Sequence, residues 1–157
     1  MDNNDVLKRL RYALNIPDPK IVEILALAGY AIGKEELEGI FKAEGESGYI
    51  ECNDSLMDKF LEALVQSRRG KREGGDAERP RLSGNRRLSN NDILKRIRIA
   101  LELKDEDIIA IMRLAGSEIS KSELGALFRK SGHPNYRPCG DQFLRLFLSG
   151  LTAKYRG

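Results

Sequence analysis

The sequence contains nearly the same 68-residue segment twice, and this repeat limits the folds open to the chain more than any other feature. Residues 3–70 align without a gap on residues 90–157 after a shift of 87 positions. By direct count, 29 of the aligned positions are identical. A gapless match of this length indicates an internal duplication. Because its period is too long for a solenoid repeat, each copy should be a small module of several helices.

Each copy contains four segments in which apolar residues recur at the spacing of an α-helix, and no segment shows the alternation of a β-strand. In the first copy these apolar positions are Val6, Leu10, Ala13, Leu14, Ile21, Ile24, Leu25, Ala28, Leu37, Ile40, Phe41, Leu56, Met57, Phe60, Leu61 and Leu64. The predicted fold class is therefore all-α, with two tandem and similar four-helix modules that pack together.

The ends of these helices are predicted from residues that favour caps. The predicted N-caps are Asn3 or Asn4, Asp18 and Asp54 in the first copy, and Asn90 or Asn91, Asp105 and Asp141 in the second. Ser120 and Glu123 have the spacing of a capping box. The glycines predicted to end the second and third helices are Gly29, Gly45, Gly116 and Gly132.

The predicted domain organisation is a first helical module at 1–67, a basic linker at 68–89 and a second module at 90–157. The linker is rich in Gly, Pro, Ser and charge, which favours a flexible segment long enough to let the modules meet. The last helix of the second module is apolar around much of its circumference near Phe147. Such a helix must be covered on more than one side, and the other copy is the nearest cover.

The net charge of +3 conceals a difference between the copies. Residues 1–67 contain 7 Lys and Arg against 13 Asp and Glu, residues 68–89 contain 8 against 3, and residues 90–157 contain 12 against 8. Three interpretations remain open: drift on solvated faces, attraction between the two halves, or binding of an anionic partner by the linker and second half.

Composition and patterning point to a cytoplasmic protein that is not a membrane protein. The apolar runs are too short to span a bilayer, and the first residues lack the pattern of a signal peptide. Two cysteines in 157 residues do not make a disulfide framework. We therefore expect free thiols and no membrane partner.

The residues that could carry chemistry do not form a catalytic pattern. The loop before the last helix of each copy repeats Tyr49, Cys52, Asp54, Tyr136, Cys139 and Asp141. A cysteine just before a helix could be a reactive thiolate, but a buried anchor of the loop is the simpler interpretation. His133, Cys139 and Asp141 do not supply a convincing metal ligand set. The sequence predicts no enzyme, no cofactor and no metal site.

Basic residues suggest a different activity, the binding of anions or nucleic acid. In the first helix of each copy, Asp5 and Asp92 precede Arg9 and Arg96 by four residues, a spacing that favours a salt bridge on a solvated face. The second and third helices resemble a helix-turn-helix in outline, with the better charge in the second copy. The candidate contacts to an anion or nucleic acid are Lys95, Arg96, Arg98, Lys121, Arg129 and Lys130.

The doubled NNDxLKRxRxAL, the LAG turn and the segment FRKSGHPNYRPCGDQFLRLFLSGL at 128–151 resemble the YehS-like family of uncharacterised bacterial proteins. The resemblance covers both copies. Its most specific part, around Cys139, is altered in the first copy, where Asn53 and Ser55 stand in place of Gly140 and Gln142. The resemblance implies a cytoplasmic bacterial protein and no particular activity.

Taken together, these observations favour a non-enzymatic interaction scaffold with a protein partner or with self-association. The alternative is a nucleic-acid-binding protein that uses the basic second module, the linker and the helix-turn-helix-like hairpin. Binding of generic DNA and RNA across a salt series distinguishes the two.

Overall fold

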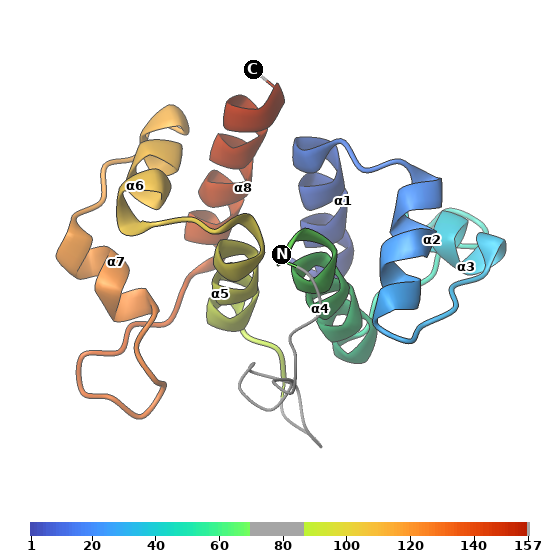
Figure 1. Ribbon diagram of the computed structural model, residues 1–157, viewed down its shortest axis with the longest axis horizontal. Helices are drawn as coiled ribbons and strands as arrows, with labels where there is room; N and C mark the ends of the chain where they lie inside the picture. Colours follow the sequence, from blue (N-terminus) through green and yellow to red (C-terminus); the bar gives the residue numbers. More distant parts are fainter. Residues whose placement is uncertain (70–86, 157) are drawn as a thin grey trace.

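The computed structural model describes residues 1–69 and 87–156, and these residues form eight α-helices and no strand (Figure 1). The first copy contains α1 (Asn3–Leu14), α2 (Asp18–Leu27), α3 (Lys34–Ile40) and α4 (Asp54–Arg69). The second contains α5 (Asn90–Leu101), α6 (Asp105–Leu114), α7 (Lys121–Leu127) and α8 (Asp141–Arg156). Every boundary in the first copy recurs in the second after a shift of 87. The predicted all-α fold of two similar four-helix copies is confirmed.

Most of the predicted N-caps are wrong by one residue. The side chain of Asp2 caps α1, and Ser89 caps α5 in a capping box with Asp92. Asn3, Asn4, Asn90 and Asn91 are helical residues with a different role, and Asp18, Asp54, Asp105 and Asp141 are the first residues of their helices. The cap of α4 is Asn53, whose side-chain oxygen accepts from the Leu56 N–H at 2.8 Å. The capping box of Ser120 and Glu123 is confirmed.

Left-handed residues end the first two helices of each copy. Gly29 and Gly116 follow α2 and α6 with φ of 80° and 82°, as predicted. Asn15 and Glu102 end α1 and α5 with φ of 54°. The third helices are shorter than predicted, because α3 ends at Ile40 and α7 at Leu127, before the predicted glycines Gly45 and Gly132. The loops that follow, residues 41–53 and 128–140, are correspondingly longer than helices ending at these glycines would leave.

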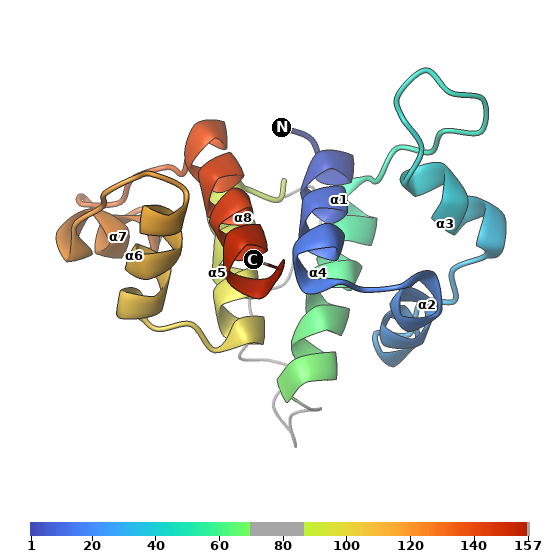
Figure 2. The same cartoon turned by 90° about the horizontal axis from the view of Figure 1, so that it is seen from above.

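The two copies pack through a central bundle formed by their first and last helices. α1 lies along α8 of the other copy, and α4 lies along α5 (Figure 2). Outside this bundle α2 packs on α4 and α6 packs on α8. α8 is therefore covered on two sides, as its apolar circumference predicted, and Phe147 and Phe60 are almost fully buried. We call the contact of α1 with α8 and of α4 with α5 the seam.

Polar contacts cross the seam as well as apolar ones. Arg96 is 3% exposed, and its Nη2 lies 2.6 Å from the Asp58 carboxylate in the other copy. The Arg156 guanidinium lies over the Tyr12 ring, 4.2 Å from its centroid. The sequence had suggested intrahelical pairs for Arg9 and Arg96. Instead, Arg96 reaches across the seam, and no ion pair joins Arg9 to Asp5 in the described part of the chain.

The predicted linker begins and ends inside ordered structure. α4 continues to Arg69, beyond the predicted boundary at residue 67, and Ser89 already caps α5. The prediction of a flexible segment concerns residues 70–86, which lie outside the described residues. Within the described ranges, no helix is both long and apolar enough to cross a membrane.

Candidate functional site

A pair of asparagines at the start of α1 holds the loop that precedes α4. The Asn4 side-chain amide donates to the carbonyl oxygens of Ile40 and Ile50, both at 3.0 Å, and its oxygen accepts from the Cys52 N–H at 2.9 Å. Asn3 donates to the Cys52 carbonyl at 3.0 Å and to the Asp54 carboxylate at 2.8 Å. Each asparagine thus closes the loop onto the helix, which explains why a long irregular segment keeps one conformation.

The second copy repeats this asparagine clamp bond for bond. Asn91 donates to the carbonyls of Leu127 at 2.8 Å and Arg137 at 3.0 Å, and accepts from the Cys139 N–H at 2.8 Å. Asn90 donates to the Cys139 carbonyl and to the Asp141 carboxylate. The asparagines were predicted as caps, so sequence reasoning missed this role. The sequence did hold one signal of this role: both Asn pairs are identical in the two copies, whereas the caps before them, Asp2 and Ser89, differ.

The structure brings together the repeated loop residues, but not as a reactive site. Cys52 and Cys139 are 2% and 6% exposed, and burial raises the pKa of Cys52 to about 12 and that of Cys139 to about 11. The carboxylates of Asp54 and Asp141 make a smaller contribution to the same rise in pKa. Such thiols stay protonated at neutral pH, as buried anchors of their loops do. Tyr49 and Tyr136 lie in the turns before them, half-buried, as backbone donors to residues 46 and 133.

The two clamped loops meet at the joint between the copies. The Asp54 carboxylate accepts from the Leu88 N–H at 3.0 Å, and the Asp141 carboxylate contacts the Met1 ammonium at 2.7 Å. Leu88 and Met1 are equivalent after the shift of 87, so the two contacts mirror each other. A groove of about 770 Å³ lies here, lined by both cysteines and by residues of both copies. Its lining includes Met1, Asp54 and Leu88, which join the copies, and asparagines that clamp the loops.

Among the described residues, His133 is not part of a cluster of side chains that could bind a metal. Its Nδ1 accepts from the Asn135 N–H at 3.0 Å, and its side chain is exposed on the loop, whereas Cys139 is buried. No cluster of three or more His, Cys, Asp or Glu side chains that could hold a metal ion occurs within residues 1–69 and 87–156.

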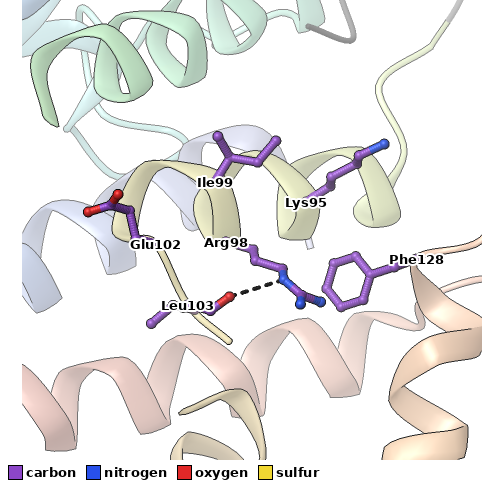
Figure 3. A pocket seen from close by; sticks show the side chains of 6 residues that line it. All are labelled: Lys95, Arg98, Ile99, Glu102, Leu103 and Phe128. Atoms are coloured by element: carbon purple, nitrogen blue, oxygen red, sulfur yellow. Dashed lines mark hydrogen bonds between the residues drawn. The ribbon is translucent and has the colours of Figure 1, made fainter. Parts of the chain in front are cut away.

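A second depression lies between α5 and the end of α7, with a volume of about 410 Å³ (Figure 3). Its lining is mainly apolar and comes from Lys95, Arg98, Ile99, Glu102, Leu103 and Phe128. Figure 3 shows Arg98 reaching over Phe128, with its carbon Cζ 4.6 Å from the ring centroid. The Arg98 Nε also donates to the Leu103 carbonyl at 3.1 Å, and its guanidinium pairs with Asp105 at 2.9 Å. Arg98 is therefore a wall of this pocket.

The six predicted contacts to an anion separate into two groups. Arg96 is buried at the seam, and Arg98 is partly exposed and paired with Asp105, so both guanidinium groups are already engaged within the chain. Arg11 makes the same contacts as Arg98 in the first copy, to Ile16, Asp18 and Phe41. The other four predicted residues are exposed: Lys95, Lys121, Arg129 and Lys130. The last three lie on α7 and the loop after it.

Comparisons with known proteins agree with the duplication. The profile of a family described as "Protein of unknown function (DUF1456)" matches twice, at residues 3–70 and 90–157. The chain is also similar to the "Uncharacterized protein YehS" of Escherichia coli (strain K12). The two are 40% identical over 154 residues, which cover 98% of this chain and 96% of that protein. No solved structure matches.

Proposed function

Because the chain belongs to the DUF1456 family of proteins of unknown function, its role has to be inferred from its own geometry, and we propose that it is a non-enzymatic scaffold that binds protein partners. The side chains that could take part in catalysis have structural roles instead, which supports a non-enzymatic function. The repeated cysteines are buried and protonated, and the repeated asparagines and aspartates are used to hold loops and helices in place. These polar side chains therefore fix the positions of the loops and helices.

The observation that carries the proposal is the pocket between α5 and α7. Its apolar walls come from Ile99, Leu103 and Phe128, and its rim includes the exposed Lys95. A depression of this size can take one or two apolar side chains of a partner, while the exposed cations beside it favour acidic neighbours on that partner. The chemistry therefore fits a protein segment with an apolar anchor flanked by carboxylates.

A capture experiment with matched variants tests this proposal. Ile99→Glu places a carboxylate in the pocket, and Tyr12→Glu makes the same change at the equivalent position of the first copy, where Tyr12 is 58% exposed. We expect a tagged chain and its Tyr12→Glu variant to retain the same protein partner from the native cell extract, and Ile99→Glu to lose it. Circular dichroism melting confirms that both variants fold. Equal retention by both variants would refute the pocket as the binding site.

A second candidate function, nucleic-acid binding, is favoured by the exposed cations after α7. Lys121, Arg129 and Lys130 lie on one outer end of the molecule and could contact phosphates. A mobility-shift assay with generic DNA and RNA tests it. Binding that weakens steeply with added salt would favour this function, and the absence of a shift at low salt would exclude it.

A further inference from the structure

The charge difference between the copies is concentrated at the two outer ends of the molecule. We call residues 34–53, which contain α3 and the loop after it, the acidic end, and residues 121–140, which contain α7 and its loop, the basic end. The acidic end has 2 Lys against 6 Glu, a net charge of −4, and the basic end has 4 Lys and Arg against 1 Glu, a net charge of +3.

Uniform drift does not account for this distribution. Over the aligned residues, 3–70 carry 9 Lys and Arg against 12 Asp and Glu, a net charge of −3, and 90–157 carry 12 against 8, a net charge of +4. The copies therefore differ by 7 charge units, and the two ends account for all 7. Each end has only 20 of the 68 aligned positions, so an even spread would place about 2 units there. The outer ends have therefore diverged in charge more than the rest of the fold.

The two ends have the same backbone conformation despite their opposite charge. In the acidic end the Ile50 N–H donates to the Gly39 carbonyl at 3.0 Å, and in the basic end the Arg137 N–H donates to the Ala126 carbonyl at 3.0 Å. The asparagine clamp holds both loops in the same way. Figures 1 and 2 show the two ends on opposite sides of the molecule, separated by the central bundle. They cannot meet within one chain.

Most charged side chains of the two ends are exposed and form no ion pair with another described residue. Glu36 accepts from the Tyr30 hydroxyl and Arg137 lies 3.9 Å from Glu123, so these have local contacts. Six of the exposed charged side chains are Glu35, Glu38, Glu44, Lys121, Arg129 and Lys130, and none of these six forms an ion pair with another described residue. The acidic end also exposes Glu46, Glu51 and one cation, Lys34. Each end thus offers at least three open charges of its own sign to an approaching surface.

We propose that the acidic end of one chain binds the basic end of a second copy of the same chain. This inference rests on the proposed scaffold function and names one partner of it. Because the two surfaces differ, the contact is head-to-tail and leaves a free acidic end and a free basic end on every dimer, so that further copies can add. The pocket lies beside the basic end, because Phe128 is the first residue of its loop.

Charge reversal at each end provides the test. The first variant carries Glu35→Lys, Glu38→Lys and Glu44→Lys and has two basic ends. The second carries Lys121→Glu, Arg129→Glu and Lys130→Glu and has two acidic ends. The control carries Glu23→Lys and Arg113→Glu, which are exposed residues outside the ends. Sedimentation velocity over a range of protein concentrations measures association, and circular dichroism confirms folding.

We expect the unaltered chain and the control to associate with increasing concentration at low salt. Raising the ionic strength from about 0.1 M to about 1 M shortens the Debye length from about 10 Å to about 3 Å and should weaken this association. Each reversed variant alone should associate about tenfold more weakly, because three exposed ion pairs are lost. An equimolar mixture of the two variants should associate again, since each then meets the opposite charge.

Three outcomes would overturn the inference: an unaltered chain that stays monomeric at low salt, reversed variants that associate as strongly as the control, or a mixture that does not recover association. The scaffold function is tested separately, because Ile99→Glu alters capture of another protein without changing either end. If the basic end binds nucleic acid instead, the unaltered chain should stay monomeric and should shift DNA or RNA, and the second variant should lose that shift. This outcome would also overturn self-association.

Discussion

Replacing Asn4 with Ala should destabilise the protein more than replacing Asn91 with Ala, although both side chains form the same three hydrogen bonds. Asn4 is 2% exposed, and its bonds to Ile40 and Cys52 are buried. Asn91 is half-buried, and its bond to the Arg137 carbonyl is exposed. Water can replace the lost partner at Asn91 but not at Asn4.

The expected magnitudes follow from the cost of unsatisfied groups. A typical hydrogen bond contributes about 1 kcal/mol, and a buried group left without a partner costs about 1–3 kcal/mol. Asn4→Ala leaves two carbonyls and one N–H without their partner, two of them buried, so we expect a loss of about 3–5 kcal/mol. For Asn91→Ala we expect about 1–2 kcal/mol, because solvent reaches the same groups.

Urea denaturation followed by circular dichroism measures both losses on one scale. Asn135→Ala, a change in an exposed loop position of the second copy, controls for the substitution itself. The reasoning would be refuted by equal losses for the two clamp variants, or by a larger loss for Asn91→Ala. Either result would show that burial of the bonds does not set their contribution.

Three further predictions concern the core, the packing of α6 on α8 and the thiols. Phe147→Ala should cost about 3–5 kcal/mol and lower a single calorimetric transition, whereas two separate transitions would show that the copies unfold independently. Gly150→Ala should cost about 1–3 kcal/mol in urea denaturation, because its Cβ would collide with the Ile111 backbone oxygen; an unchanged midpoint would show that the helices separate freely. Iodoacetamide at pH 8 should alkylate Cys52 and Cys139 only after unfolding. Folding raises the pKa of Cys52 to about 12 and that of Cys139 to about 11, above the ordinary 9.0, so the unfolded chain loses these thiol protons first. The stability that these thiols contribute is therefore fully present below pH 9 and should be lost as the pH rises from 9 through the folded pKa values.

The internal repeat made the element order predictable, because two divergent copies report the same apolar stripes. Val6 of the first copy is replaced by Ile93 in the second, and Leu10 by Ile97. Both substitutions keep an apolar side chain on a buried helix face. The same logic located the broad apolar face of α8. The spacing of apolar residues along a single helix predicts which of its faces is buried, so this feature could be predicted without a structure.

The polar contacts could not be predicted in the same way. Asn at the start of a helix satisfies the pattern of a cap, and only the fold shows that Asp2 already fills that role beside Asn3. The pair of Arg96 with Asp58 depends on α5 lying along α4, which no local spacing encodes. Its counterpart positions hold Arg9 and Arg145, so the repeat gave no second example of the pair.

The crossed arrangement of α1 with α8 and α4 with α5 has a consequence for synthesis on the ribosome. When residue 69 has been translated, the faces of α1 and α4 that belong in the seam have no partner, because the helices that cover them are encoded up to 87 residues later. At about 5–20 residues per second, the 87 residues from Arg69 to Arg156 take roughly 4–17 s to add, and α1 has no α8 to pack on until they are made. During that interval a neighbouring nascent chain on the same message exposes the same surface. Correct pairing of the halves is therefore a competition between a tethered partner that arrives late and an untethered one that is already present.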